Sequence, residues 1–153
     1  DDFPSRPWFR YESPGTRFTE KRGMDWDMRA EEVSHLKDTL AHANLVITYG
    51  SSIGIDASIF DKPVIIMDFE INPSVSYVER PTLRYATEHL TKAIASGGMR
   101  RARDRADLAS AINEYLANPG LDREGRARLV REQAGPVDGQ SGERIAAAIL
   151  KGL

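Results

Sequence analysis

The sequence predicts an α/β fold with a mostly parallel sheet, and three features of its central part support this. Two short apolar runs, residues 45–48 and Val64–Met67, lack polar alternation, which is typical of strands buried on both faces. Residues 53–60 between them have the length of a two-turn helix. Strand, helix and strand in this order predict a βαβ crossover. We therefore expect five strand side chains to be buried: Val46, Ile47, Val64, Ile65 and Ile66.

The flanking elements follow from apolar spacing and breaker residues. An amphipathic helix is expected at residues 30–43, where Val33, Leu36, Leu40 and Ala43 recur at helical intervals. Residues 68–87 contain two X-Pro pairs and no period, which predicts a long loop of functional or mobile character. The other expected elements are a short strand at 17–20, helices at 89–95, 104–116, 122–132 and 141–150, and a polar edge strand at 99–103.

Composition limits the classes of protein to which the chain can belong. Its 153 residues are 41% hydrophobic, enough for one packed core, which argues against disorder. The 21 basic and 23 acidic residues nearly cancel, so no overall field would attract nucleic acid. Cys is absent, which excludes disulfides and thiolate metal sites. Because there is neither a long apolar run nor a signal-like start, we expect a soluble protein.

The most informative motif lies between the first apolar run and the helix after it. Gly50 allows a tight turn, and the small residues Ser51 and Ser52 let a ligand approach the backbone. Beginning at Ile53, the helix offers unpaired N–H groups and the positive end of its dipole, which suits a phosphate or diphosphate. Asp56, one turn further, could accept hydrogen bonds from ribose or sugar hydroxyls. The alternative is that the serines cap a structural helix and Asp56 is solvated.

The same residues also match a hydrolase motif. Gly50, Ser52 and Gly54 have the spacing of a nucleophile elbow, and Asp68 and His89 would complete a Ser, Asp, His order. The hydrolase fold needs several strands before the elbow, and only one weak strand precedes Ser52. We therefore rank this interpretation below the anion site.

Two further clusters have simpler explanations. His35, Asp38 and His42 lie on one stripe of the first helix, but the separation of the two histidines is too long for one metal ion. Four arginines in the expected edge strand and just after it lack the aromatic residues of a nucleic-acid site, and they are diluted by acidic residues. We expect a charged edge strand. The charges that discourage its pairing with another chain are those of Arg100, Arg101, Arg103 and Arg105.

Three segments together resemble a known enzyme family. The first runs from Asn44 through the serine pair to Asp56 and ends at Asp61-Lys62-Pro63; the second is Ser96-Gly97-Gly98 with the strand and helix after it. The third, residues 135–145, is similar to a closing motif of Asp, Gly, Ser, Arg and Ile. In this order they resemble the C-terminal donor-binding domain of GT-B-type transferases, most closely CDP-glycerol glycerophosphotransferases and related surface-polysaccharide enzymes.

The resemblance covers residues 31–150 and implies both a fold and a site. The fold would be a Rossmann-like three-layer α/β/α domain at residues 31–153, the C-terminal half of a GT-B enzyme, after an irregular N-terminal segment at 1–30. The family's serine pair holds the donor's diphosphate. This implies that the donor is bound through its diphosphate and ribose by Gly50, Ser51, Ser52, Ile53 and Asp56.

For function, the resemblance implies that the chain is the donor-binding part of a two-domain transferase. It would move a glycerol-phosphate or glycosyl group from a nucleotide-diphosphate donor to a cell-surface polysaccharide or teichoic-acid-like acceptor. The family's catalytic base lies in a separate N-terminal domain, so the catalytic residues stay unassigned and the chain alone is expected to be inactive.

The resemblance also sets expectations for partners and surroundings. The expected partners are the nucleotide-linked donor and the missing N-terminal domain, not nucleic acid. No cofactor or metal is expected. The expected location is the cytoplasm or the inner face of the cell membrane. Two alternatives stay open: a UDP-N-acetylglucosamine 2-epimerase-like enzyme, and a non-catalytic domain that binds nucleotide sugar or a protein partner.

Overall fold

The computed structural model describes residues 5–12, 15–17, 26–72, 74, 76 and 81–152. The chain divides into two compact units, Asp1–Thr39 and Leu40–Leu153. The N-terminal unit pairs strand β1 (Thr16–Arg17) antiparallel with β2 (Trp26–Asp27). Residues 18–20 of the strand predicted at 17–20 lie outside the described residues.

Helix α1 (Ala30–His42) confirms the predicted amphipathic helix and runs across the border between the two units. Glu32 helps to cap the N-terminus of this helix: its carboxylate accepts a 2.7 Å hydrogen bond from the Arg29 N–H. Within the N-terminal unit, His35 Nε2 lies 2.6 Å from a carboxylate oxygen of Glu12.

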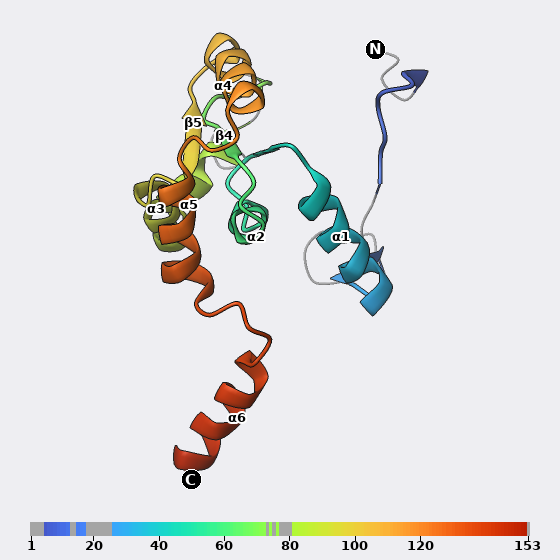
Figure 1. Cartoon of the computed structure of the whole chain (residues 1–153). Coiled ribbons are helices and arrows are strands. Elements are labelled where there is room, and N and C mark those ends of the chain that lie inside the picture. Colours follow the sequence, from blue (N-terminus) through green and yellow to red (C-terminus); the bar gives the residue numbers. More distant parts are fainter. Residues whose placement is uncertain are drawn as a thin grey trace. The chain divides into compact units, whose positions relative to one another are not determined.

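The C-terminal unit is built on a three-stranded parallel sheet, shown in green and yellow in Figure 1. Strands β3 (Val46–Thr48), β4 (Val64–Met67) and β5 (Met99–Ala102) lie in this order. Helix α2 (Ile53–Ile59) connects β3 to β4, and α3 (Glu88–Ala95) precedes β5. The predicted α/β fold and its βαβ crossover are therefore confirmed.

Further helical segments complete this unit. The 3₁₀-helix η3 (Pro81–Ala86) lies inside residues 68–87, so the prediction of a loop throughout was wrong for this part. Helix α4 (Arg105–Ala117) begins at Asp104, whose side chain accepts a hydrogen bond from the Asp107 N–H. The remaining segments are α5 (Arg123–Leu129), the π-helical turn η4 (Val130–Ala134) and α6 (Ser141–Gly152), and no described residue of α6 is buried.

The core of the C-terminal unit lies around β4. Ile65 packs with Ala111 and Tyr115 of α4, whereas its neighbour Val64 faces α2, because successive side chains of a strand point to opposite faces. At Gly54 of α2, an added Cβ would lie 2.9 Å from the Met99 side chain and 3.1 Å from that of Val64. Glycine therefore allows α2 to pack closely on the sheet.

Burial agrees with the prediction on β4 but not on β3. Val64, Ile65 and Ile66 are at most 1% exposed. Val46 is only half-buried and Ile47 is 40% exposed, so the expectation of full burial was wrong for β3. Position at the sheet edge is not enough to explain this, because β5 is also an edge strand and its Met99 and Ala102 are buried.

Arg126 of α5 fixes the amino-terminal edge of this sheet. Its side chain is 1% exposed and donates hydrogen bonds to the Asp61 carboxylate at 2.9 Å, to Leu121 O at 2.6 Å and to Pro119 O at 2.9 Å. Asp61 also accepts a 2.7 Å bond from Arg123. We call these five residues the Arg126 cluster; it ties the loop before β4 to the loop before α5.

Candidate functional site

The turn between β3 and α2, Tyr49 to Ser52, lies at the carboxyl end of the parallel strands. Gly50 is buried, and its N–H donates to the hydroxyl oxygen of Tyr85 from η3. The same hydroxyl donates to the carbonyl oxygen of Met67 at the end of β4. A single side chain therefore holds the turn against the neighbouring strand.

Tyr85 remains a hydrogen-bond donor throughout the physiological pH range. Burial of its ring, together with the negative charge of Asp68, raises the pKa of its hydroxyl well above the ordinary value. The residue is 8% exposed. The phenol therefore stays protonated and keeps its bond to Met67.

The backbone amides of the turn fall into two pairs. Ile53 N–H donates to Ser51 Oγ at 3.4 Å, and Gly54 N–H donates to Ser51 O at 3.3 Å. In the part of the chain that the structure describes, the N–H groups of Ser51 and Ser52 have no acceptor. The Ile53 and Gly54 amides at the start of the helix, which the sequence predicts to be unpaired, are therefore engaged within the turn, whereas those of Ser51 and Ser52 have no described acceptor.

The two serine side chains of the turn make few of the hydrogen bonds that would cap α2. Ser52 is exposed, occupies the residue before α2 and makes no side-chain capping bond. Ser51 Oγ makes only the long contact to Ile53. The alternative that both serines serve to cap a structural helix therefore explains little of this geometry.

Asp56 lies one turn into α2 and is exposed. Desolvation of its carboxyl group by the protein atoms around it raises its pKa above the ordinary value. Among the described residues no donor faces this carboxylate. Its carboxylate oxygens therefore have no described partner, and the predicted role in binding a ligand hydroxyl stays a prediction.

A polar cluster that the sequence analysis did not assemble lies beside this turn. Arg101 of β5 forms an ion pair with Asp68, the residue after β4, and its guanidinium lies 6.0 Å from the centroid of the Tyr85 ring. Arg101 lies on β5, Asp68 directly follows β4, and Tyr85 lies on η3. The pairing follows from strand register, which a single sequence does not reveal.

The arrangement of Asp68 gives no support to the hydrolase interpretation. Asp68 pairs with Arg101, and His89 is an exposed residue near the start of α3. No hydrogen bond between described residues links Ser52, Asp68 and His89. A nucleophilic serine would need such a relay to remove its proton.

The four arginines of the basic run do not form one patch, because the two that lie in β5 point to opposite faces of the sheet. Arg100 forms a bidentate pair with Glu114 of α4, at 2.6 and 3.1 Å, and this lowers the pKa of that carboxyl. Arg101 faces the opposite side. The remaining two, Arg103 and Arg105, follow the strand at the start of α4.

The closing motif of the family resemblance has a local structural role in this chain. The Asp138 carboxylate accepts hydrogen bonds from the Gln140 N–H at 3.1 Å and from both terminal nitrogens of Arg144. These bonds hold the pKa of Asp138 below its usual value. The pair fixes the chain at the beginning of α6.

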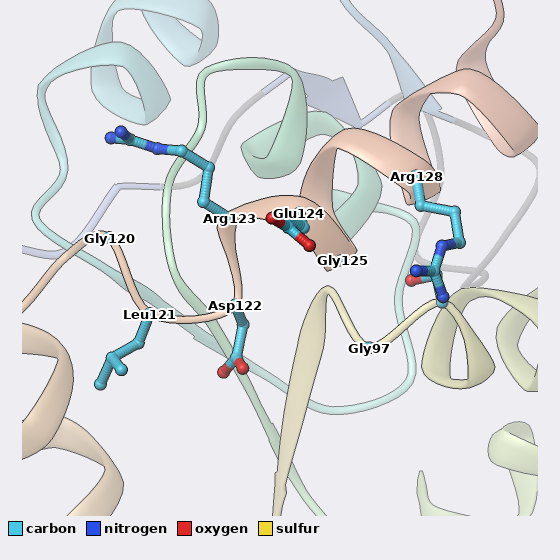
Figure 2. A pocket seen from close by; sticks show the side chains of 9 residues that line it. Gly97, Gly120, Leu121, Asp122, Arg123, Glu124, Gly125 and Arg128 are labelled. Atoms are coloured by element: carbon cyan, nitrogen blue, oxygen red, sulfur yellow. The ribbon is translucent and has the colours of Figure 1, made fainter.

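A pocket of about 670 Å³ lies at the opposite, amino-terminal edge of the sheet (Figure 2). It lies between the Gly97 loop and the start of α5, and Arg128 extends from α5 toward that loop. Its lining is mostly glycine and charged residues, unlike the apolar lining of most small-molecule sites. None of the predicted site residues is among its lining.

The described residues form neither a metal-binding cluster nor a membrane-spanning helix. No group of three His, Asp or Glu side chains lies close enough to hold a metal ion, and this includes the stripe of His35, Asp38 and His42. Nor does any described helix have the length and apolar character needed to span a bilayer.

No family model matches the chain, and no significant match is found among curated proteins or solved structures.

Proposed function

We propose that the C-terminal unit binds a nucleoside diphosphate at the carboxyl edge of its sheet, as the donor-binding half of a GT-B-type transferase. The proposal includes the finer fold, a Rossmann-like three-layer domain. In open parallel sheets, ligands bind outside the carboxyl ends of the strands. The turn from Tyr49 to Ser52 occupies this position.

One observation carries the proposal. At the turn, the backbone amides of Ser51 and Ser52 have no acceptor among the described residues, and Tyr85 holds Gly50 in place beside them. Unpaired amides on a fixed backbone favour an anion, because they need no reorganisation when it binds. Asp56, one helical turn away, supplies open oxygens for a ribose hydroxyl.

The chemistry assigned to these residues is to bind and stabilise a leaving group. When the donor transfers its glycerol-phosphate or glycosyl group, negative charge grows on the departing nucleotide. N–H groups directed at that charge stabilise it in the transition state. A base that activates the acceptor would come from a second domain, and the acceptor would be a cell-envelope polymer.

Titration calorimetry of the chain with UDP and CDP tests the proposal. We expect one of them to bind, and Ser52→Asp to weaken that binding tenfold or more, since like charges about 4 Å apart repel by roughly 1–4 kcal/mol. Ser52→Ala should cost about 1 kcal/mol or less, the net value of one hydrogen bond.

Ser141→Asp provides the matched control, because it places the same charge at another exposed serine where a helix begins. It should change affinity less than about twofold, an effect below 0.5 kcal/mol. Each variant must first melt like the parent. Undiminished binding by Ser52→Asp would move the site away from this turn.

A further inference from the structure

Strand β3 has an open backbone edge. Among the described residues it pairs with β4 only, and the Val46 N–H donates to Pro63 O at 2.9 Å. In a parallel pair, alternate residues of a strand bond to a given neighbour, so Val46 and Thr48 bond to β4. The N–H and C=O of Ile47 therefore point away from β4, as a donor and an acceptor at the edge of the sheet.

The side chains along this edge are apolar and incompletely covered. Ile47 is in register with Ile65, so it shares the face of the sheet that packs against α4, and alternation places Leu45 and Tyr49 on the same face. Leu45 and Tyr49 are half-buried, and Ile47 between them is 40% exposed. The edge thus offers apolar surface together with open backbone groups to a partner strand.

Charge distinguishes the two outer strands of the sheet. Proteins commonly protect an edge strand from pairing with another chain by placing charged side chains on it. Strand β5 carries Arg100 and Arg101. Residues 43–55, which include β3, contain no Asp, Glu, Lys or Arg. The edge at β3 therefore lacks the protection that β5 has.

This edge is complementary to itself. If two copies pair antiparallel about a two-fold axis at Ile47, each Ile47 lies opposite the other, and Leu45 lies opposite Tyr49 of the second copy. Directly opposite residues of antiparallel strands share a face, and their side chains contact each other. Near a two-fold axis a charged side chain would meet its own copy, and this edge has none. The chemistry of the edge therefore suits a second copy of the chain.

We propose that two copies of this chain associate through β3, with the strands antiparallel and Ile47 at the two-fold axis. The two three-stranded sheets then form one continuous sheet, in which the Ile47 N–H and C=O groups bond to those of the second copy. Because the paired strands run in opposite directions, the two turns from Tyr49 to Ser52 lie at opposite edges of the joined sheet. The inference goes beyond the proposed function and does not depend on nucleotide binding.

The absence of Cys from the chain allows a direct test of the register. Ile47→Cys places two thiols opposite each other, with Cα atoms about 5.5 Å apart, which is within the range of a disulfide. Mild oxidation should therefore link two chains. Leu45→Cys is the matched control on the same face of the strand, because its thiol lies opposite Tyr49 and far from its own copy. Equal cross-linking of the two variants would overturn the inference.

Sedimentation equilibrium of the whole chain, over a series of concentrations, measures association without a cross-link. Because the paired segment is short, we expect a concentration-dependent dimer. Ile47→Lys should raise its dissociation constant about tenfold or more, since two like charges would meet at the axis. Ile149→Lys is the matched control, the same change at a 59% exposed isoleucine of α6, and should leave the constant unchanged.

Circular dichroism shows whether each variant keeps the fold of the parent, and the two cysteine variants test the pairing if Ile47→Lys does not fold. A parent chain that stays monomeric at every concentration would overturn the inference. So would a dimer that Ile149→Lys disrupts and Ile47→Lys does not, because the apolar stripe of α6 would then join the two copies.

Discussion

At the scale of single residues, Tyr85 does most to shape the candidate site. Its hydroxyl accepts from the Gly50 N–H and donates to Met67 O, so it joins the ends of two strands. Gly50 is buried and Met67 is partly buried, and a buried polar group that loses its partner costs more than a hydrogen bond gains. Tyr85 thus contributes to stability and to the shape of the turn.

Replacing Tyr85 by Phe should destabilise the C-terminal unit by about 1–3 kcal/mol, because the change leaves the Gly50 amide and the Met67 carbonyl unsatisfied. Urea unfolding followed by circular dichroism measures the loss. Tyr11→Phe is the control at a position 80% exposed, where a change within about 0.5 kcal/mol is expected. Equal stability of the Tyr85→Phe variant and the parent chain would show that the hydroxyl bonds do not hold the turn.

At the scale of secondary-structure elements, close backbone approach decides how α5 packs. A Cβ at Gly125 would lie 2.3 Å from the carbonyl carbon and oxygen of Gly97 and 2.6 Å from Gly98 N. These are backbone atoms and cannot swing aside as a flexible side chain can. The adjacent Arg126 is buried at the same contact, so α5 and the loop before β5 must fit together within narrow limits.

Gly125→Ala should therefore lower the free energy of unfolding by roughly 3 kcal/mol, at the upper end of overpacking effects. Gly142→Ala is the matched control: it also lies in a helix, but a Cβ there meets nothing within 4 Å. It should be neutral or stabilising by up to about 1 kcal/mol, the difference in helix propensity. Chemical denaturation of both variants checks this, and similar values for the two would contradict the packing argument.

The elements also show why sequence reasoning succeeded where it did. Helix α4 and strand β4 were predicted because their signals, an Asp cap and an unbroken apolar run, are local. Burial of Ile47 was predicted wrongly, since it depends on what lies beside β3 in space. The 3₁₀-helix η3 carries no periodic pattern and was missed.

At the scale of the site, the turn was found in the sequence but its neighbours were not. Gly50 and the serine pair form one continuous motif, whereas Tyr85 contacts Gly50 from far along the chain and Arg101 contacts Tyr85 in turn. Arg101 and Asp68 are 33 positions apart, and Arg126 and Asp61 are 65 apart. Contacts of this kind follow from register and packing, so a pattern of nearby residues cannot predict them.

At the scale of the whole C-terminal unit, the two edges of the sheet differ in character. At the amino-terminal edge, buried Arg126 donates hydrogen bonds to Asp61, Leu121 O and Pro119 O, and these bonds fix the two loops there to each other. The carboxyl edge combines a held backbone with amides and a carboxylate that have no described partner.

Helix α6 contributes no buried residue to the C-terminal unit. Removing it tests whether the unit is stable without it. None of its described residues is buried, and Ile145, Ile149 and Leu150 are 59–72% exposed. A chain that ends at Ala134 keeps the Arg126 cluster and the core around β4. Its melting temperature should stay within about 2–4 °C of the parent, a change of at most about 1 kcal/mol.

A chain that ends at Gly120 is the informative comparison, because it lacks Arg126 and the fully buried Leu129. Loss of that guanidinium leaves the Asp61 carboxylate and the Pro119 carbonyl without their donor, so we expect no cooperative unfolding transition. Thermal denaturation of both truncated chains decides the matter. If the chain ending at Ala134 melted far below the parent, the apolar stripe of α6 would have to pack against part of the protein and contribute to its core.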